Sequence, residues 1–164
     1  MKNINIYKAV LLLFTLSLSI SCDEGGDPDP GATSTVEMAG DWFVQLATDG
    51  VASGAYYQIS TYNTSTDDGT EMWVDDHQNF WWFKAKSPVN LNSLTFSGSD
   101  LASSVDGYDI TVSITNGAIT KGDTETSAGN ISDGISFDIE FSDDAGTIYS
   151  LVGYKRTGLL EDEH

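Results

Sequence analysis

Strict alternation of apolar and polar residues near the end of the chain most constrains how it can fold. The apolar positions of residues 135–142 are Ile135, Phe137, Ile139 and Phe141, each followed by a polar residue. Residues 109–114 repeat the pattern. A period of two is typical of a β-strand with one buried face, whereas a helix would space its apolar residues by three and four. No segment after residue 39 shows that helical spacing, so the alternation indicates a β protein.

Other segments extend this prediction to the rest of the chain. We expect strands at residues 41–46, 55–62, 71–75, 80–85, around 94–96, and at 147–155. Turns rich in Gly, Asn, Asp and Ser separate them, and Asn116-Gly117 is the strongest short signal for a hairpin. About eight or nine strands at such short intervals predict an all-β fold, either a sandwich or an up-and-down barrel.

The first and last strands favour the barrel. Gly40-Asp41-Trp42 opens the first strand, and Arg156 closes the last. The Gly-x-Trp pattern is similar to the motif of lipocalins, in which the tryptophan closes the base of the barrel and a basic residue packs over its ring. The resemblance implies a lipocalin-like antiparallel barrel closed by Trp42 and Arg156, although Trp42 could equally be an ordinary core residue.

The charge of the chain excludes several partners. It has 25 acidic against seven basic residues, a formal net charge of −18. Such a surface repels phosphate backbones, so we expect no nucleic-acid partner. It equally repels anionic lipid headgroups, so any membrane contact must come from an attached lipid.

The start of the chain predicts how that contact is made. Two lysines precede an apolar run, residues 9–18, that is too short to span a bilayer, as in a cleaved export signal. Small residues then lead to Cys22, the single cysteine. This end resembles the lipobox of bacterial lipoproteins, which implies cleavage before Cys22 and acyl chains on that residue. The alternative is a secreted protein with a free thiol.

These signals divide the chain into three parts. Residues 1–21 are the expected lipoprotein signal peptide, residues 22–36 a lipidated cysteine with a flexible tether, and residues 37–164 the barrel. The tether is acidic and rich in Gly and Pro. Acidic residues behind the cysteine resemble the signal that places Bacteroidetes lipoproteins on the outer face of the cell. The resemblance implies an outer-membrane lipoprotein facing the exterior.

A second resemblance covers most of the domain. Its blocks follow one another in the order expected for the family: Thr61-Tyr62-Asn63-Thr64, Met72 to Asp76, Asn79 to Lys84, and Tyr154 to Gly158. These blocks resemble a Bacteroidetes lipoprotein family labelled "lipid-binding putative hydrolase", which has a lipocalin-like barrel. The resemblance implies lipid binding and a hydrolase activity, but it carries no catalytic motif to this chain.

The residues themselves offer few catalytic groups. His77 is the one histidine before the last residue, so any Ser-His-Asp triad must use it. Neighbouring strand residues point to opposite faces, so Asp75, Asp76 and His77 converge only if their turn folds inward. A polar turn is the simpler account, and His77 remains a weak catalytic candidate. A single internal histidine and no cysteine pair also argue against zinc, and the acidic turns at 67–69 and 143–146 fit no EF-hand. We expect neither a metal nor a cofactor.

The aromatic residues are the better functional candidates. In a strand over 80–85, Trp81 and Trp82 would face opposite sides. The expected ligand-binding residues are those that could line a barrel cavity, namely Tyr57, Trp73, Phe137, and whichever of Trp81 and Trp82 faces inward. The alternative is that all of these rings fill a small barrel.

Two classes of function therefore remain open, with hydrolysis a distant third. The first is a lipid-anchored envelope barrel that binds a small apolar or amphipathic molecule such as a lipid. The second is a filled barrel that serves a protein partner at the cell surface. A cavity would favour the first, and a packed interior with an exposed tryptophan would favour the second.

Overall fold

The computed structural model describes residues 31–164, and the domain treated below is Thr33–His164. Cys22, the expected signal peptide and most of the expected tether lie outside the described residues. No helix among the described residues has the length and apolar character needed to cross a membrane.

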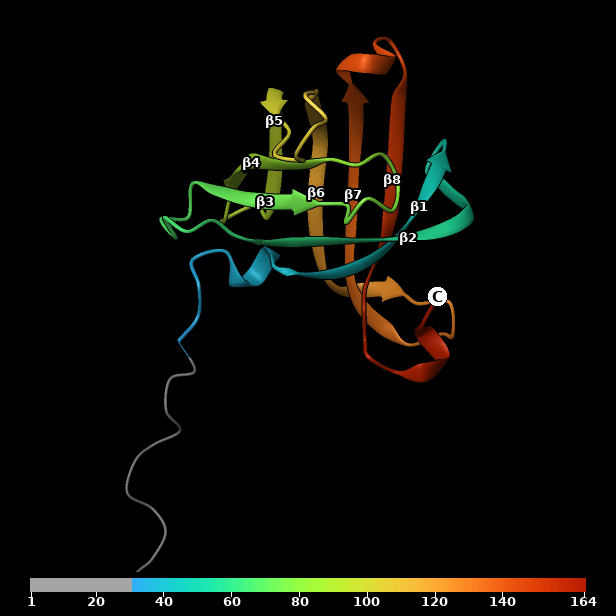
Figure 1. Cartoon of the computed structure of the whole chain (residues 1–164). Helices are drawn as coiled ribbons and strands as arrows, with labels where there is room; N and C mark the ends of the chain where they lie inside the picture. Colours follow the sequence, from blue (N-terminus) through green and yellow to red (C-terminus); the bar gives the residue numbers. More distant parts are fainter. Residues whose placement is uncertain (1–30) are drawn as a thin grey trace, which may run out of the picture. The chain divides into compact units, whose positions relative to one another are not determined.

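Eight antiparallel strands close into a barrel, which confirms the predicted fold (Figure 1). The strands are β1 (Gly40–Thr48), β2 (Val51–Asn63), β3 (Glu71–Asp75), β4 (Lys84–Asn90), β5 (Thr95–Ala102), β6 (Thr111–Glu125), β7 (Ile131–Phe141) and β8 (Ile148–Lys155). Each strand pairs with the next along the chain, and β1 also pairs with β8 to complete the ring. Three short 3₁₀ helices accompany them, η1 (Val36–Met38), η2 (Ser142–Asp144) and η3 (Leu160–Asp162).

Inward-facing side chains fill the barrel. Between their bulges the strands turn alternate residues inside, and these residues form a single packed cluster with a few residues from η1 and the loops. Its largest fully buried members include Trp42, Phe83, Phe141 and Met38. The alternation over 135–141 therefore marks the inner face of β7, as the sequence predicts.

The predicted hairpin turn at Asn116-Gly117 was wrong. β6 continues through this pair, where it forms a bulge, and ends only at Glu125. Asn116 has a φ of 54°, and a side chain at Gly117 would overlap the carbonyl oxygen of Phe96. The pair thus bends β6 and lets two strands approach closely. Gly favours such a bulge as much as it favours a turn, which is why the sequence signal was ambiguous.

The expected strand over 80–85 begins only at Lys84. Residues 76–83 instead form a loop between β3 and β4. Asp76 organises this loop, and its hydrogen bonds hold Phe80 to Phe83 away from a strand ladder.

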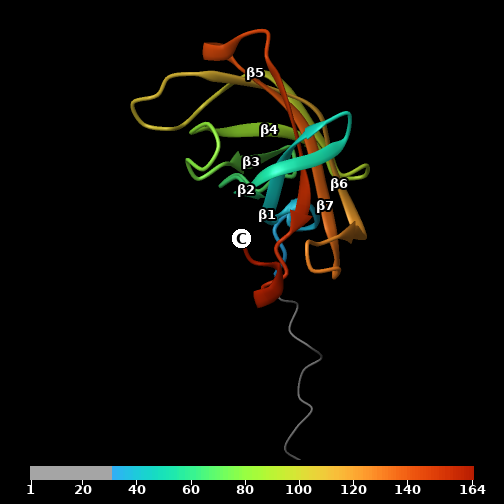
Figure 2. The same ribbon diagram turned by 90° about the vertical axis from the view of Figure 1, so that its right-hand side faces the viewer.

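The end of the chain packs beside the hairpin of β6 and β7 (Figures 1 and 2). Asp162 in η3 is buried and accepts hydrogen bonds from the side chain of Asn130 at 3.0 Å and from the backbone N–H of Ala128 at 3.3 Å. Thr157 donates a third, at 2.8 Å. One carboxylate therefore joins the last residues to the hairpin.

Candidate functional site

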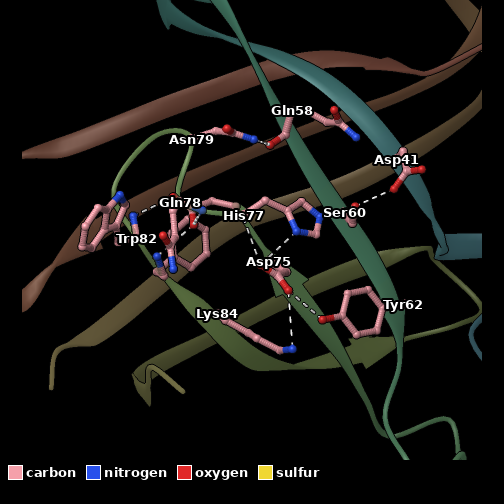
Figure 3. Close-up of polar contacts among 12 residues, drawn as sticks. Asp41, Gln58, Ser60, Tyr62, Asp75, His77, Gln78, Asn79, Trp82 and Lys84 are labelled. Atoms are coloured by element: carbon pink, nitrogen blue, oxygen red, sulfur yellow. Dashed lines mark hydrogen bonds and ion pairs between the residues drawn. The ribbon is translucent and has the colours of Figure 1, made fainter. Parts of the chain in front are cut away.

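A row of polar residues crosses the outer surface of the barrel (Figure 3). The strand register places Asp41 on β1 opposite Ser60 on β2, Ser60 opposite Asp75 on β3, and Asp75 opposite Lys84 on β4. Directly opposite residues of antiparallel strands point to the same side of a sheet. Because the flanking residues of these strands are buried inside, the row lies on the outside.

Ser60 lies at the centre of this row and contacts two groups that can accept its proton. Its Oγ donates a hydrogen bond to Oδ1 of Asp41 at 2.5 Å and lies 2.7 Å from Nε2 of His77. Only 6% of Ser60 is exposed, whereas 44% of the His77 side chain is exposed. The hydroxyl is thus enclosed, with the imidazole above it facing solvent.

Asp75 lies on the far side of the imidazole. Its Oδ1 accepts the backbone N–H of His77 at 3.0 Å and lies 3.6 Å from Nδ1 of the ring. Tyr62 donates to Oδ2 at 2.7 Å, and Lys84 Nζ lies 3.5 Å from the same oxygen. Burial raises the pKa of Asp75, but these hydrogen bonds and the neighbouring positive charge outweigh it and leave the pKa below its ordinary value.

The loop of residues 76–83 explains why His77 returns over the sheet. The φ angle of His77 is 49°, a left-handed conformation that turns the chain back. The buried carboxylate of Asp76 fixes the loop by accepting five backbone N–H groups, those of Gln78, Phe80, Trp81, Trp82 and Phe83, at 2.7–3.2 Å. The position of the imidazole is therefore set by a rigid loop.

The same loop separates the two expected tryptophans. Trp81 stacks on Phe141, with ring centroids 4.6 Å apart, and packs against the core. Trp82 has a φ of 68° and is 53% exposed. Trp81 therefore belongs to the barrel, and Trp82 projects from a rigid turn into solvent.

The other expected ligand residues do not share one cavity. Tyr57 packs against Phe80 near the rim, at 5.1 Å between ring centroids. Phe137 is buried against Phe96. Trp73 was expected to face inward, but β3 turns Met72 and Val74 inside and leaves Trp73 on the outer face. There its ring lies 5.0 Å from Nζ of Lys84 and 5.2 Å from Nζ of Lys86.

The closure of the barrel also differs from expectation in one residue. Trp42 is fully buried, as expected, but Lys155 lies over its ring, with Nζ 5.9 Å from the centroid. The register pairs Trp42 with Lys155, so both point inward. Arg156 follows Lys155, lies over Phe43 instead, and pairs with Glu163 at 2.5 Å.

A hollow of about 400 Å³ lies on the outer face of the barrel, over β6, β7, β8, β1 and β2. Tyr56, Val152 and Tyr154 give it apolar walls, and Gln45 and Thr126 give it polar edges. Such mixed walls suit an amphipathic molecule.

Comparison with protein families decides the membership of this chain. A family model described as "Lipid-binding putative hydrolase" matches residues 27–160. The chain belongs to this family. No curated protein matches the chain. In this member of the family, the described residues contain no group of three or more His, Cys, Asp or Glu side chains that could hold a metal ion.

Sequence reasoning missed Ser60 and Asp41 as parts of this site. Ser60 stands 17 residues before His77, in a strand whose composition marks it only as part of the sheet. The one signal that could have found it is the register of β1, β2 and β3, which places Asp41, Ser60 and Asp75 in line.

Proposed function

We propose that this chain is a lipid-anchored protein of the cell envelope that binds a small apolar or amphipathic molecule, such as a lipid, on the outside of its barrel. The family model supports lipid binding. We place the ligand on the outer face because packed side chains fill the interior of the barrel. The hollow bounded by Tyr56, Val152 and Tyr154 is the proposed binding site.

Titration of the purified protein with an apolar fluorescent probe tests the site. Val152→Asp should raise the Kd at least about tenfold, since a charge in an apolar contact costs well over 1.4 kcal/mol. Ile148→Asp is the matched control, because Ile148 lies on the same strand and is exposed outside the hollow. Equal loss of affinity in both variants, with folding intact, would place binding elsewhere.

The anchor and location are part of the proposal, and Cys22 supports them by its place behind the expected export signal. Acyl chains contribute about 0.8 kcal/mol per buried CH₂, so two or three of them hold a protein firmly. Cys22→Ala should therefore move the protein from the membrane fraction to the soluble fraction. Protease added to intact cells should digest the wild-type protein if it faces the exterior. A Cys22→Ala variant that still sediments after a salt wash would contradict lipid anchoring.

The packed interior and the exposed Trp82 together favour a second candidate function, the binding of a protein partner. A large exposed ring on a loop fixed by Asp76 loses little conformational freedom when it is buried in an interface. Native mass spectrometry of the protein purified from its own envelope should then show a bound chain. Trp82→Ala should release that chain while leaving probe binding unchanged.

A further inference from the structure

We propose that Ser60, His77 and Asp75 form an ester-hydrolysing site on the outer face of the barrel, and that its substrate is a neutral carboxylic ester. Ser60 is the nucleophile, His77 the base, and Asp75 the group that orients the base. This activity goes beyond the binding function proposed above and is carried by a different set of contacts.

The distance from His77 to Ser60 fits these roles, and the distance from His77 to Asp75 is that of an ion-pair contact, longer than a hydrogen bond. A catalytic base must lie within about 2.6–3.2 Å of the atom that it deprotonates. Nε2 of His77 lies 2.7 Å from Oγ of Ser60, and Nδ1 faces Asp75 at 3.6 Å. A nucleophile, a base beside it and a third group that orients the base are the recurring arrangement of covalent catalysis.

Two features hold the base in place. Tyr62 and Lys84 hold the second oxygen of Asp75, so this carboxylate keeps its position beside the ring. The Asp76 hydrogen bonds fix the loop that carries His77. Asp76 is thus a positioning residue, and it touches none of the reacting atoms.

Gln58 supplies a donor for the charge that develops on the substrate. It stands two residues before Ser60 on the same face of β2 (Figure 3). Its backbone carbonyl accepts a hydrogen bond from Asn79 at 2.8 Å, while its side-chain amide makes no hydrogen bond within residues 31–164. A side-chain amide free to donate is a suitable group for stabilising an oxyanion.

The reaction needs no reactant other than the ester and one water molecule. Oγ of Ser60 bonds to the ester carbonyl carbon as its proton passes to Nε2 of His77. The bond to the alcohol oxygen then breaks, and His77 returns the proton to the departing alkoxide, leaving an acyl group on Ser60. Water adds to the same carbon and gives a proton to His77. The bond to Oγ breaks, Ser60 recovers that proton, and a carboxylic acid leaves.

The surroundings select the class of substrate. The carboxylates of Asp41 and Asp75 flank Ser60, and among the described carboxylates Lys84 pairs only with Asp75. The chain also carries a formal net charge of −18, so an anionic substrate is repelled. Beside Gln58 lies a hollow of about 350 Å³ that is also lined by Tyr56, Asn79 and His164 and is mainly polar. A polar, uncharged ester group suits these walls, so the surroundings point to neutral esters.

Hydrolysis of 4-nitrophenyl butyrate by the full chain tests the assignment. Ser60→Ala and His77→Gln should each lower kcat/KM at least about a hundredfold, as removal of a true nucleophile or base does. Ser150→Ala is the matched control, since its hydroxyl also donates to an aspartate at 2.5 Å, but no imidazole contacts it in the described domain. This control should change kcat/KM less than about twofold.

A covalent probe and a charged substrate complete the test. An organophosphonate should label Ser60, as peptide mass spectrometry would show, and His77→Gln should slow the labelling. The anionic 4-nitrophenyl hemisuccinate should react at least about tenfold more slowly than the butyrate, the factor that about 1.4 kcal/mol of repulsion gives.

Full activity in Ser60→Ala, or labelling at other serines only, would overturn the site. Equal rates for the two esters would overturn the substrate class. Probe binding is measured separately, so failure of either proposal leaves the other standing.

Discussion

The indole N–H of Trp42 donates a 2.8 Å hydrogen bond to the hydroxyl of Thr61, and that hydroxyl in turn donates to the carbonyl of Met38 at 2.6 Å. All three residues are buried. The hydroxyl therefore satisfies one buried donor and one buried acceptor and joins β1, β2 and η1 at one end of the barrel. A buried tryptophan needs such a partner for its N–H group.

Thr61→Val should lower the free energy of unfolding by at least about 2 kcal/mol, since each buried polar group left without a partner costs about 1–3 kcal/mol. Valine keeps the shape and removes only the hydroxyl. Urea unfolding measures the change. Thr115→Val is the control on an exposed strand position and should change stability by less than about 0.5 kcal/mol. An equal effect of the two substitutions would mean that the hydrogen bonds of Thr61 carry no net stability.

Double-mutant cycles should show that Trp42 couples to Lys155 and not to Arg156. Lys155→Met combined with Trp42→Leu should give a coupling energy of at least about 0.5 kcal/mol, because an ammonium over an indole is worth about 1–2 kcal/mol when partly desolvated. The same cycle with Arg156→Met should be additive within about 0.5 kcal/mol, since Arg156 lies over Phe43. The reverse order of the two couplings would show that Arg156, and not Lys155, packs on Trp42.

Asp76→Asn should loosen the whole loop between β3 and β4. The amide would place an NH₂ group against N–H donors, and each donor left unpaired costs about 1–3 kcal/mol. We expect a loss of several kcal/mol in unfolding free energy and faster hydrogen exchange at Trp81 and Trp82. Asp106→Asn is the exposed control and should leave both quantities unchanged. Unchanged exchange in Asp76→Asn would mean that packing of Trp81 on Phe141, and not this carboxylate, holds the loop.

The sequence predicted the barrel because most strands carry a signal of their own, although β4 was expected at 80–85 and begins only at Lys84. Alternation over 135–141 requires one buried and one exposed face, and eight strands with short turns close readily into a ring. The Gly-x-Trp start correctly indicated that Trp42 is a core residue near the closure of the barrel. What it could not distinguish was Lys155 from Arg156, because that choice depends on a register of one residue.

The polar site escaped prediction for the same reason. Ser60 and His77 come together only once β2 is paired with β3 and the loop after β3 is folded. The loop itself depends on one buried aspartate, and no local pattern distinguishes Asp76 from the exposed acidic residues around it. The aromatic run after it has strong strand propensity, which the hydrogen bonds to Asp76 override.

Acid should weaken the attachment of the C-terminal segment through Asp162. A hydrogen bond from Thr126, then those from Thr157, Asn130 and the backbone of Ala128, lower the pKa of this carboxyl below its ordinary value. A depressed pKa in the folded state contributes stability that is fully present above the ordinary pKa of about 3.9 and is lost as the pH falls through the folded pKa.

Asp162→Asn should therefore be less stable than the wild type at neutral pH, and the difference should shrink as the pH falls below about 4. Urea midpoints measured across this range test it, with Asp109→Asn as an exposed control that leaves the profile unchanged. A difference that grows toward acid pH would have the wrong sign for a carboxylate stabilised in the folded state.

Asp41→Asn should speed the reaction of Ser60 with an organophosphonate. The single proton of the Ser60 hydroxyl has two acceptors, Asp41 at 2.5 Å and His77 at 2.7 Å, and its bond to Asp41 directs it away from the base. A hydrogen bond to a charged group is worth about 1.5–3 kcal/mol, and each 1.4 kcal/mol corresponds to about tenfold in rate. Asparagine can donate to Oγ instead, which turns the hydroxyl toward Nε2. We expect labelling at least about tenfold faster, as mass spectrometry would measure.

The gain should vanish in the Asp41→Asn, His77→Gln double variant, because the freed proton then has no imidazole to receive it. Slower labelling of Asp41→Asn would instead make Asp41 the base that activates Ser60.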